Sequence, residues 1–519
     1  MIQQCLVSSA TGRWILLATL LASGTAFLMG TAVIVALPTI QVHFSTTITG
    51  IQWVVNAHLL SLATLLLIGG SLGDHFGRKR IFISGIAIFT TGAILSGFAG
   101  SIGQLIAFQC VQGMGSALMI PQSLAIINAC FTENHRGRAI GLWAGFSGGI
   151  AALGPWLGGW LVETFSWQAI FFMTVPLGIL VVAVTAVYIP ESRDPGAHKL
   201  DWSGTLFIFL GLFGIAYGLI SGPVVGWNTL LVLVSLVGGV VAIIFFVLVE
   251  LRQPEPLVPL HIFRNPLVAG ANTVTFFLYF ALNGVIFFLV LNLQQVQDYS
   301  PAMAGIGLLP PIVLIAFLAG PAGALSDRIG PRLQMVAGPM IVALGIALLT
   351  ISGTDASYFK HFLPGLILFG IGMALVIAPL TKSALFVEPQ FSGSASGVNN
   401  SVSRIAALMA VAVLGAIVIS AFTIRLNDVI STPSLAPEEQ RQILSQSDKL
   451  GGIVIPDTFD ETASMIARNA VKESFIYGFR WAMGISAVLA LAGALVSFIT
   501  IHGPPRPPSL VSEDADQSY

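Results

Sequence analysis

The chain has 519 residues, of which 55% are hydrophobic and 9% are charged, against roughly 25% charged in typical soluble domains. This composition excludes a soluble protein and indicates a polytopic membrane protein. The net charge of -1 gives no overall positive potential that would attract nucleic acid. Three scattered cysteines, Cys5, Cys110 and Cys130, can supply neither a disulfide framework nor a cysteine-based zinc site, and we expect no metal and no cofactor.

Apolar runs that can cross about 30 Å of hydrocarbon occur fourteen times, each near the roughly twenty residues that a helix needs. They are continuous and rich in Leu, Ile, Ala and Gly, which favours helices over a transmembrane barrel and predicts an all-α membrane protein. The first run is too long for the hydrophobic part of a signal peptide, so we expect it to be retained. We expect the spans to begin near Trp14, Ile51, Ile81, Gly103, Arg138, Gln168, Ser203, Trp227, Val268, Met303, Gln334, Phe362, Asn400 and Phe475.

Basic residues are distributed unequally between the two sets of loops. The short loops after odd-numbered spans contain only Lys360. The loops after even-numbered spans contain Arg78, Lys79, Arg80, Arg136, Arg138, Arg193, Lys199, Arg252, Arg264, Arg328, Arg332 and Lys382. Because cytoplasmic loops retain positive charge, the sequence predicts a multi-pass protein of the cell (inner or plasma) membrane with both termini in the cytoplasm.

The one long odd-numbered loop, residues 424–474, is predicted to be extracytoplasmic, with a local helix around residues 437–447. The tail, residues 502–519, begins with prolines and continues with polar and acidic residues, a composition typical of disorder.

An internal repeat divides the chain. The string GSLGDHFGRKR at 70–80 recurs as GALSDRIGPRL at 323–333, and GMGSALMIP at 113–121 recurs as GIGMALVIAP at 370–379. A third pair, G-x-A-x-G at 137–141 and 393–397, has nearly the same offset. Such duplication is typical of transporters whose site lies between two halves. We predict two pseudo-symmetric six-helix bundles, residues 1–200 and 251–501, separated by an inserted helix pair at 201–250.

These residues resemble the major facilitator superfamily, and within it the fourteen-helix branch of drug:proton antiporters. VALPTI at 35–40, QWVVNAHLL at 52–60 and SWQAIFFMTVPLG at 166–178 are similar to landmarks of that branch. The first repeat copy is similar to the superfamily signature through Gly70, Leu72, Asp74, Gly77, Arg78 and Lys79, and the second copy contains Gly323, Asp327, Arg328, Gly330 and Arg332. The string GPWLGG is similar to the antiporter signature through Gly154, Pro155, Gly158 and Gly159.

The resemblance implies two helical bundles around a central cavity that opens alternately to either side. It also implies that Asp74 and its neighbours form a latch that stabilises one access state. Physically, Asp74 and Asp327 can each cap a neighbouring helix N-terminus and pair with Arg78 or Arg328. The alternative is an ordinary turn, which the presence of two symmetric copies disfavours.

The fifth span combines closely spaced glycines with Pro155, which removes a backbone donor and bends the helix. A bent, closely packed helix suits a moving interface, although a purely structural kink is the alternative. The match to G-x-S-x-G at 145–149 is coincidental, because a nucleophile elbow needs a strand-to-helix turn.

No carboxylate falls deep in a predicted span. In the first span Met29 stands where the family has an acidic residue, and in the fourth Gln109 stands where it has arginine. Both departures remove groups that the family links to proton coupling. A charge at mid-bilayer costs about 2.5–3.5 kcal/mol on insertion scales, so the ionisable residues that remain there are of interest.

Two ionisable residues remain inside spans. His58 could titrate in place of the missing carboxylate, or serve only as an aromatic hydrogen-bonding residue. Arg404 could anchor an anionic group, or pair with a helix end. Amide and aromatic residues suited to amphipathic organic molecules are candidates for the rest of the cavity lining: Gln109, Gln112, Asn272, Asn283, Trp53, Phe276, Phe277 and Phe280.

The sequence thus predicts a secondary active transporter that acts as a monomer in the lipid bilayer and exports a small amphipathic or hydrophobic compound, driven by protons. One alternative is an exporter or facilitator of a specific metabolite or lipid without proton coupling. Another is a non-transporting receptor or assembly partner, which would not need the duplicated latch. The sequence has no G-x-x-x-x-G-K-[ST] and no H-E-x-x-H motif, so we expect neither an ATP-driven pump nor an enzyme.

Overall fold

The computed structural model describes residues 5–194, 200–254, 256–388, 391–431 and 435–501. Within these ranges the chain is almost entirely helical, and β-type pairing is confined to one bridge between Cys5 and Phe131. Fourteen of the described helices or helix pairs are long and apolar enough to cross a membrane. The predicted number of spans and the all-α fold class are confirmed.

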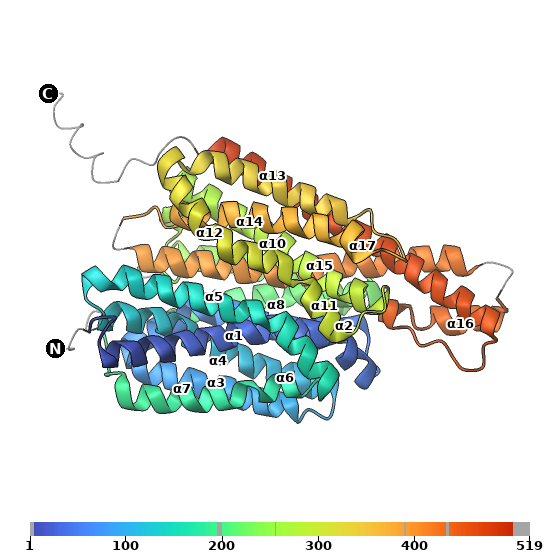
Figure 1. Cartoon of the computed structure of the whole chain (residues 1–519), viewed down its shortest axis with the longest axis horizontal. Helices are drawn as coiled ribbons and strands as arrows, with labels where there is room; N and C mark the ends of the chain where they lie inside the picture. The colour runs from blue at the N-terminus through green and yellow to red at the C-terminus, as the bar shows by residue number, and fades with distance from the viewer. Residues whose placement is uncertain (1–4, 195–199, 255, 389–390, 432–434, 502–519) are drawn as a thin grey trace.

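The chain forms three groups of helices (Figure 1). The first group is α1 (Ala10–His43), α2 (Ile48–Phe76), α3 (Arg78–Gly97), α4 (Ile102–Cys130), α5 (Glu133–Thr164), α6 (Ala169–Phe172) and α7 (Thr174–Tyr188). The inserted pair is α8 (Trp202–Val225) and α9 (Leu230–Glu250). The last group is η1 (Leu260–Arg264), α10 (Pro266–Gln295), α11 (Pro301–Gly307), α12 (Leu309–Ile329), α13 (Pro331–Leu349), η2 (Tyr358–Phe362), α14 (Leu363–Ala384), α15 (Ser392–Ile430), α16 (Pro437–Leu444), η4 (Ser447–Gly452) and α17 (Glu461–Thr500).

Two predicted helix starts are wrong. Helix α15 begins at Ser392 rather than near Asn400, and α17 begins at Glu461 rather than near Phe475. The two helices have 39 and 40 residues, about twice the length that crosses the hydrocarbon. Hydropathy locates only the apolar part of a helix, so a prediction from hydropathy places the polar turns that extend the helix in the neighbouring loops. The connection between α15 and α17 therefore shortens to residues 431–460, and the structure confirms a local helix in it, α16.

The helices α1–α7 pack together as one half and α10–α17 as the other, below and above in Figure 1. Helix α8 contacts both α2 of the first half and α15 of the second. Its contact surface is apolar and consists of buried aliphatic residues from three helices: Leu60, Leu212, Ala216, Ile220, Leu408 and Ala412. The inserted pair thus lies beside the seam between the halves.

The molecule has two distinct ends. The junction of α2 with α3 and the junction of α12 with α13 contain the two repeat copies, and we call this the latch end. Helix α1 begins there and α17 ends there, at the left of Figure 1, whereas α16 lies at the opposite end, which we call the loop end. Both latch junctions turn at a glycine with positive φ, 110° at Gly77 and 83° at Gly330. Residues with a side chain rarely adopt this backbone conformation, which accounts for a glycine at the same place in each copy.

Candidate functional site

The two halves are joined at the loop end by a set of contacts that we call the seal. Helix α5 meets α11 so closely that a Cβ atom on Gly159 would overlap the Pro301 carbonyl, and one on Gly305 would overlap the Pro155 carbonyl. The GPWLGG string therefore belongs to the contact between halves. Five hydrogen bonds complete the seal: Gln52 Nε2 to Val411 O (2.8 Å), Gln294 Nε2 to Val35 O (2.8 Å), Gln295 Nε2 to Gln41 Oε1 (2.8 Å), Gln41 Nε2 to Lys449 O (3.0 Å) and Ala302 N to Glu163 Oε2 (3.2 Å).

Between described residues, every hydrogen bond that joins the two halves belongs to the seal. In the middle of α1, Gly30 is exposed although the residues from Ile15 to Gln41 around it are buried or half-buried. No atom lies within 4 Å of where its Cβ would be. The middle of α1 is therefore accessible at Gly30.

Four side chains from four helices form what we call the central cluster, in which Phe27 of α1 contacts Arg404 of α15, and His58 of α2 and Tyr279 of α10 lie within electrostatic range of Arg404. The Arg404 guanidinium lies over the Phe27 ring at 5.4 Å from its centroid, within the range of a cation–π interaction. His58 and Tyr279 both interact electrostatically with Arg404. The two ionisable residues that the sequence singled out, one from each half, thus lie within electrostatic range of each other.

Arg404 and His58 of the central cluster both lack a polar partner within the described ranges. Among the described residues, Arg404 forms no ion pair with a carboxylate, and its guanidinium lies over the Phe27 ring. His58 is 8% exposed, and its Nδ1 has no hydrogen-bond partner. Buried polar atoms are normally hydrogen-bonded, so a ligand or water has two polar groups to bind here.

The other residues predicted to line a cavity are distributed over several places. Asn283 is half-buried and lies one turn from Tyr279 on α10, as does the half-buried Phe276, so these two share the face of Tyr279. Asn272 instead accepts a hydrogen bond from Asn399 of α15 at 3.1 Å, inside the second half.

Gln109 and Trp53 lie away from the central cluster. Gln109 Nε2 donates to Ser96 Oγ of α3 (3.0 Å) and to Gln112 Oε1 (2.8 Å), a network within the first half. The Trp53 ring packs against Phe213 and Tyr217 of α8, with centroids at 5.8 and 6.3 Å. Phe280 is 4% exposed and belongs to the core, whereas Phe277 is half-buried beside Phe276.

In the first latch copy Asp74 pairs with Arg78 at 2.7 Å, but a second carboxylate that sequence reasoning missed is central to the arrangement. Glu191, just after α7, accepts a hydrogen bond from the Lys79 N–H at 3.1 Å and lies 3.7 Å from Arg80. It therefore caps the start of α3, a role expected of Asp74. Only the three-dimensional packing of α7 against α3 brings Glu191 to this position, because it lies more than a hundred residues from Lys79 in the chain.

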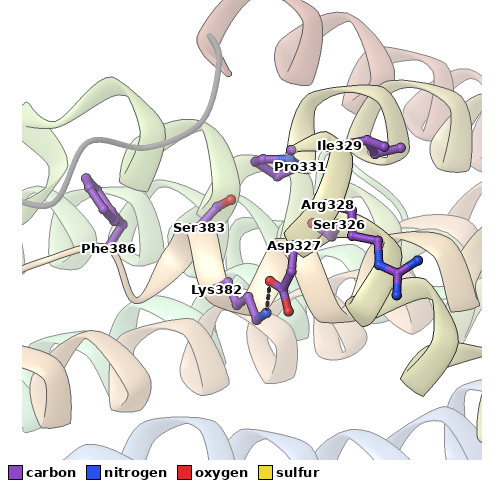
Figure 2. Close-up of a pocket in the computed structure, with 9 residues that line it drawn as sticks. Ser326, Asp327, Arg328, Ile329, Pro331, Lys382, Ser383 and Phe386 are labelled. Atoms are coloured by element: carbon purple, nitrogen blue, oxygen red, sulfur yellow. Dashed lines mark hydrogen bonds and ion pairs between the residues drawn. The ribbon is translucent and has the colours of Figure 1, made fainter.

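In the second latch copy Asp327 pairs with Lys382 of α14 at 2.5 Å rather than with the predicted partner, Arg328. Figure 2 shows that Arg328 points away from Asp327. The pair borders a hollow of about 360 Å³ formed by the end of α12, the start of α13 and the end of α14. Arg332 also turns elsewhere, over the Phe498 ring of α17 at 5.2 Å.

Comparisons with known proteins agree with this architecture. The chain is 33% identical over 495 residues to the multidrug resistance protein Stp of Mycobacterium tuberculosis, covering 92% of this chain and 91% of the relative. It is 30% identical over 500 residues to the tetracenomycin C resistance and export protein of Streptomyces glaucescens, covering 94% and 92%. Among solved structures, an inward-facing bacterial homolog of the human lysosomal transporter Spinster shares the fold, with a TM-score of 0.63, 17% identity and coverage of 95% and 97%. The family model described as Major Facilitator Superfamily matches residues 19–411, and the chain belongs to this family of membrane transporters.

Proposed function

We propose that this transporter exports small amphipathic or hydrophobic organic compounds by alternating access, driven by a proton gradient. It acts as a monomer in the cell membrane with the latch end and both termini in the cytoplasm. The central cluster carries the proposal: it joins both halves, retains unpartnered polar groups, and includes Phe27, which lies one turn from the accessible Gly30 of α1.

Three further observations support export. Relatives covering most of the chain are named for multidrug resistance or for export of tetracenomycin C. Among the described residues, the hydrogen bonds between the halves lie at the loop end, which suits a state that accepts a compound from the cytoplasm. The side chains around Arg404 are largely aromatic, and such surfaces bind the apolar bodies of organic molecules.

His58 is the proposed proton carrier. Met29 is 1% exposed in the hydrophobic core and Gln109 is bound within the first half, so neither replaces the ionisable groups that the family has there. His58 lies at the seam with a free ring nitrogen and can gain or lose a proton as access alternates.

The test uses purified protein in liposomes, with dye uptake measured with and without an imposed pH gradient. A gradient of about one pH unit is worth about 1.4 kcal/mol per proton, which corresponds to about tenfold accumulation of substrate. We expect His58→Phe to lose this accumulation while His361→Phe, which changes a half-buried histidine of η2 outside the central cluster, retains it. Gradient-dependent uptake by His58→Phe would contradict the role of His58.

A second candidate function is export or facilitated passage without protons, which the apolar surroundings of Met29 favour. In the same liposomes it would give dye flux that is equal with and without the pH gradient. Folded protein that gives no flux with any dye would instead favour a receptor or an assembly partner.

A further inference from the structure

We propose that Arg404 binds an acidic group, a carboxylate or a comparable oxyanion, on the amphipathic compound that the transporter exports. That the ligand is an exported compound rests on the proposed function, whereas the binding site itself follows from the surroundings of Arg404. The ligand class is an aromatic or otherwise apolar body that bears one anionic group.

Arg404 lies inside a membrane-crossing helix, where a charged side chain without a role would cost free energy. It lies on α15 in contact with Phe27 of the opposite half, and α15 packs against α2, α10 and α17. Placing a charged side chain inside the membrane is unfavourable in free energy, and the charged residues found there usually form pairs or serve a function. A ligand bound to Arg404 would touch both halves, as a ligand must if it is to influence their relative movement.

The charge of Arg404 is also uncompensated by a described carboxylate, in contrast to three other basic residues of the membrane-crossing helices. Arg78 pairs with Asp74, Arg425 with Glu473 and Lys472 with Asp298. The titratable side chains that interact with Arg404 are His58 and Tyr279, and neither brings a negative charge in its ordinary form at neutral pH. In the part of the chain that the structure describes, no carboxylate neutralises this guanidinium.

The surroundings match an anionic amphipathic ligand. The guanidinium presents a planar set of N–H donors that fits a carboxylate through two parallel hydrogen bonds. His58 Nδ1 is buried without a partner and can form a further hydrogen bond. Phe27 lies under the guanidinium, and Phe276 and Tyr279 occupy one face of α10, so the apolar part of the ligand has aromatic rings to pack against.

The competing explanation is that Arg404 serves only to hold α15 against Phe27 of α1. That role requires a cation over an aromatic ring and predicts no preference for acidic ligands. A comparison of ligands that differ only in their charge therefore separates the two explanations.

The experiment measures equilibrium binding of several aryl carboxylic acids, each paired with its methyl ester, to the purified full-length protein in detergent. A hydrogen-bonded charge pair is worth enough to expect about tenfold tighter binding of the acids by the unmodified protein. Arg404→Gln should lose that preference, so that each acid and its ester bind about equally. Arg425→Gln, on the same helix but paired with Glu473 toward the loop end, should keep the preference.

Equal binding of acids and esters by the unmodified protein, or an undiminished acid preference in Arg404→Gln, would overturn the proposal. Should Arg404→Gln fail to fold, the comparison of acid with ester in the unmodified protein and in Arg404→Lys decides alone, with Arg404→Lys expected to keep part of the preference. Acid-selective binding without any flux in liposomes would contradict the proposed export function and leave this site standing.

Discussion

Asp448 lies in η4, outside the helices that cross the membrane, and burial raises the pKa of its carboxyl above its ordinary value of 3.8. The neighbouring Lys449 opposes this shift more weakly. A raised pKa means that the ionised form is disfavoured in the folded protein, so the cost is present at neutral pH and disappears below pH 3.8.

We therefore expect Asp448→Asn to stabilise the protein at pH 7.5 by a small amount, about 1 °C in the midpoint of thermal unfolding. The gain should shrink as the pH is lowered toward 4, because the carboxyl is then protonated in the folded and unfolded chain alike. Thermal scans at several pH values check this. The exposed Asp457→Asn serves as the control, and an equal gain for both variants would contradict the role of burial.

For single residues, the sequence predicts a functional position well where the residue type is rare in its surroundings. His58 and Arg404 stand out because ionisable side chains seldom occur inside apolar spans, and the structure places them together. The sequence does not predict the partner of each polar side chain. Lys382 and not Arg328 pairs with Asp327, and Gln109 bonds to Ser96, because such partners depend on how helices rotate and pack after they form.

Helix α3 depends on a residue of another element for its first turn. Its N-terminal cap, Gly77, has no side chain that could accept a hydrogen bond, and the carboxylate of Glu191 accepts one from Lys79 N instead. Loss of a helix cap costs about 0.5–2 kcal/mol.

We expect Glu191→Ala to lower the unfolding temperature and to increase chemical labelling of a cysteine introduced at Arg80, since the α2–α3 junction loses one of its contacts with the end of α7 and the residues that follow it. The control is Glu133→Ala, which removes an exposed carboxylate from the first turn of α5. If Glu191→Ala and Glu133→Ala behave alike, Glu191 has no special part in holding the junction.

The elements themselves follow closely from hydropathy, since fourteen apolar runs predict fourteen spans. Their ends follow less well, as α15 and α17 show, because a polar segment such as residues 461–474 can continue a helix outside the membrane as well as end it. The glycines at Gly77 and Gly330 are visible in the sequence as a repeat, but only the structure gives their common reason, a positive φ at each latch junction.

For the whole molecule, the seal determines which end is open. Helices α5 and α11 approach most closely at Gly159 and Gly305. A larger side chain there cannot be accommodated without separating the halves, whereas α5 has free space at Gly149, ten residues earlier.

Gly159→Val should therefore disfavour the state that is closed at the loop end. Overpacking costs about 1–3 kcal/mol, which corresponds to a population shift of about fivefold to 150-fold. A cysteine introduced at Gln294, within the seal, should react faster with a membrane-impermeant reagent added at the loop end. The matched variant Gly149→Val should leave that rate unchanged, and an unchanged rate in Gly159→Val would contradict the contact.

The inserted pair makes the two sides of the seam unequal. Helix α8 lies against α2 and α15 together, so one side of the seam is screened from the surrounding lipid by a helix that belongs to neither half. On the other side α5 lies directly against α11 and α12. Removal of α8 and α9 would therefore expose the adjoining faces of α2 and α15 on one side of the seam and leave the contact of α5 with α11 on the other side unchanged.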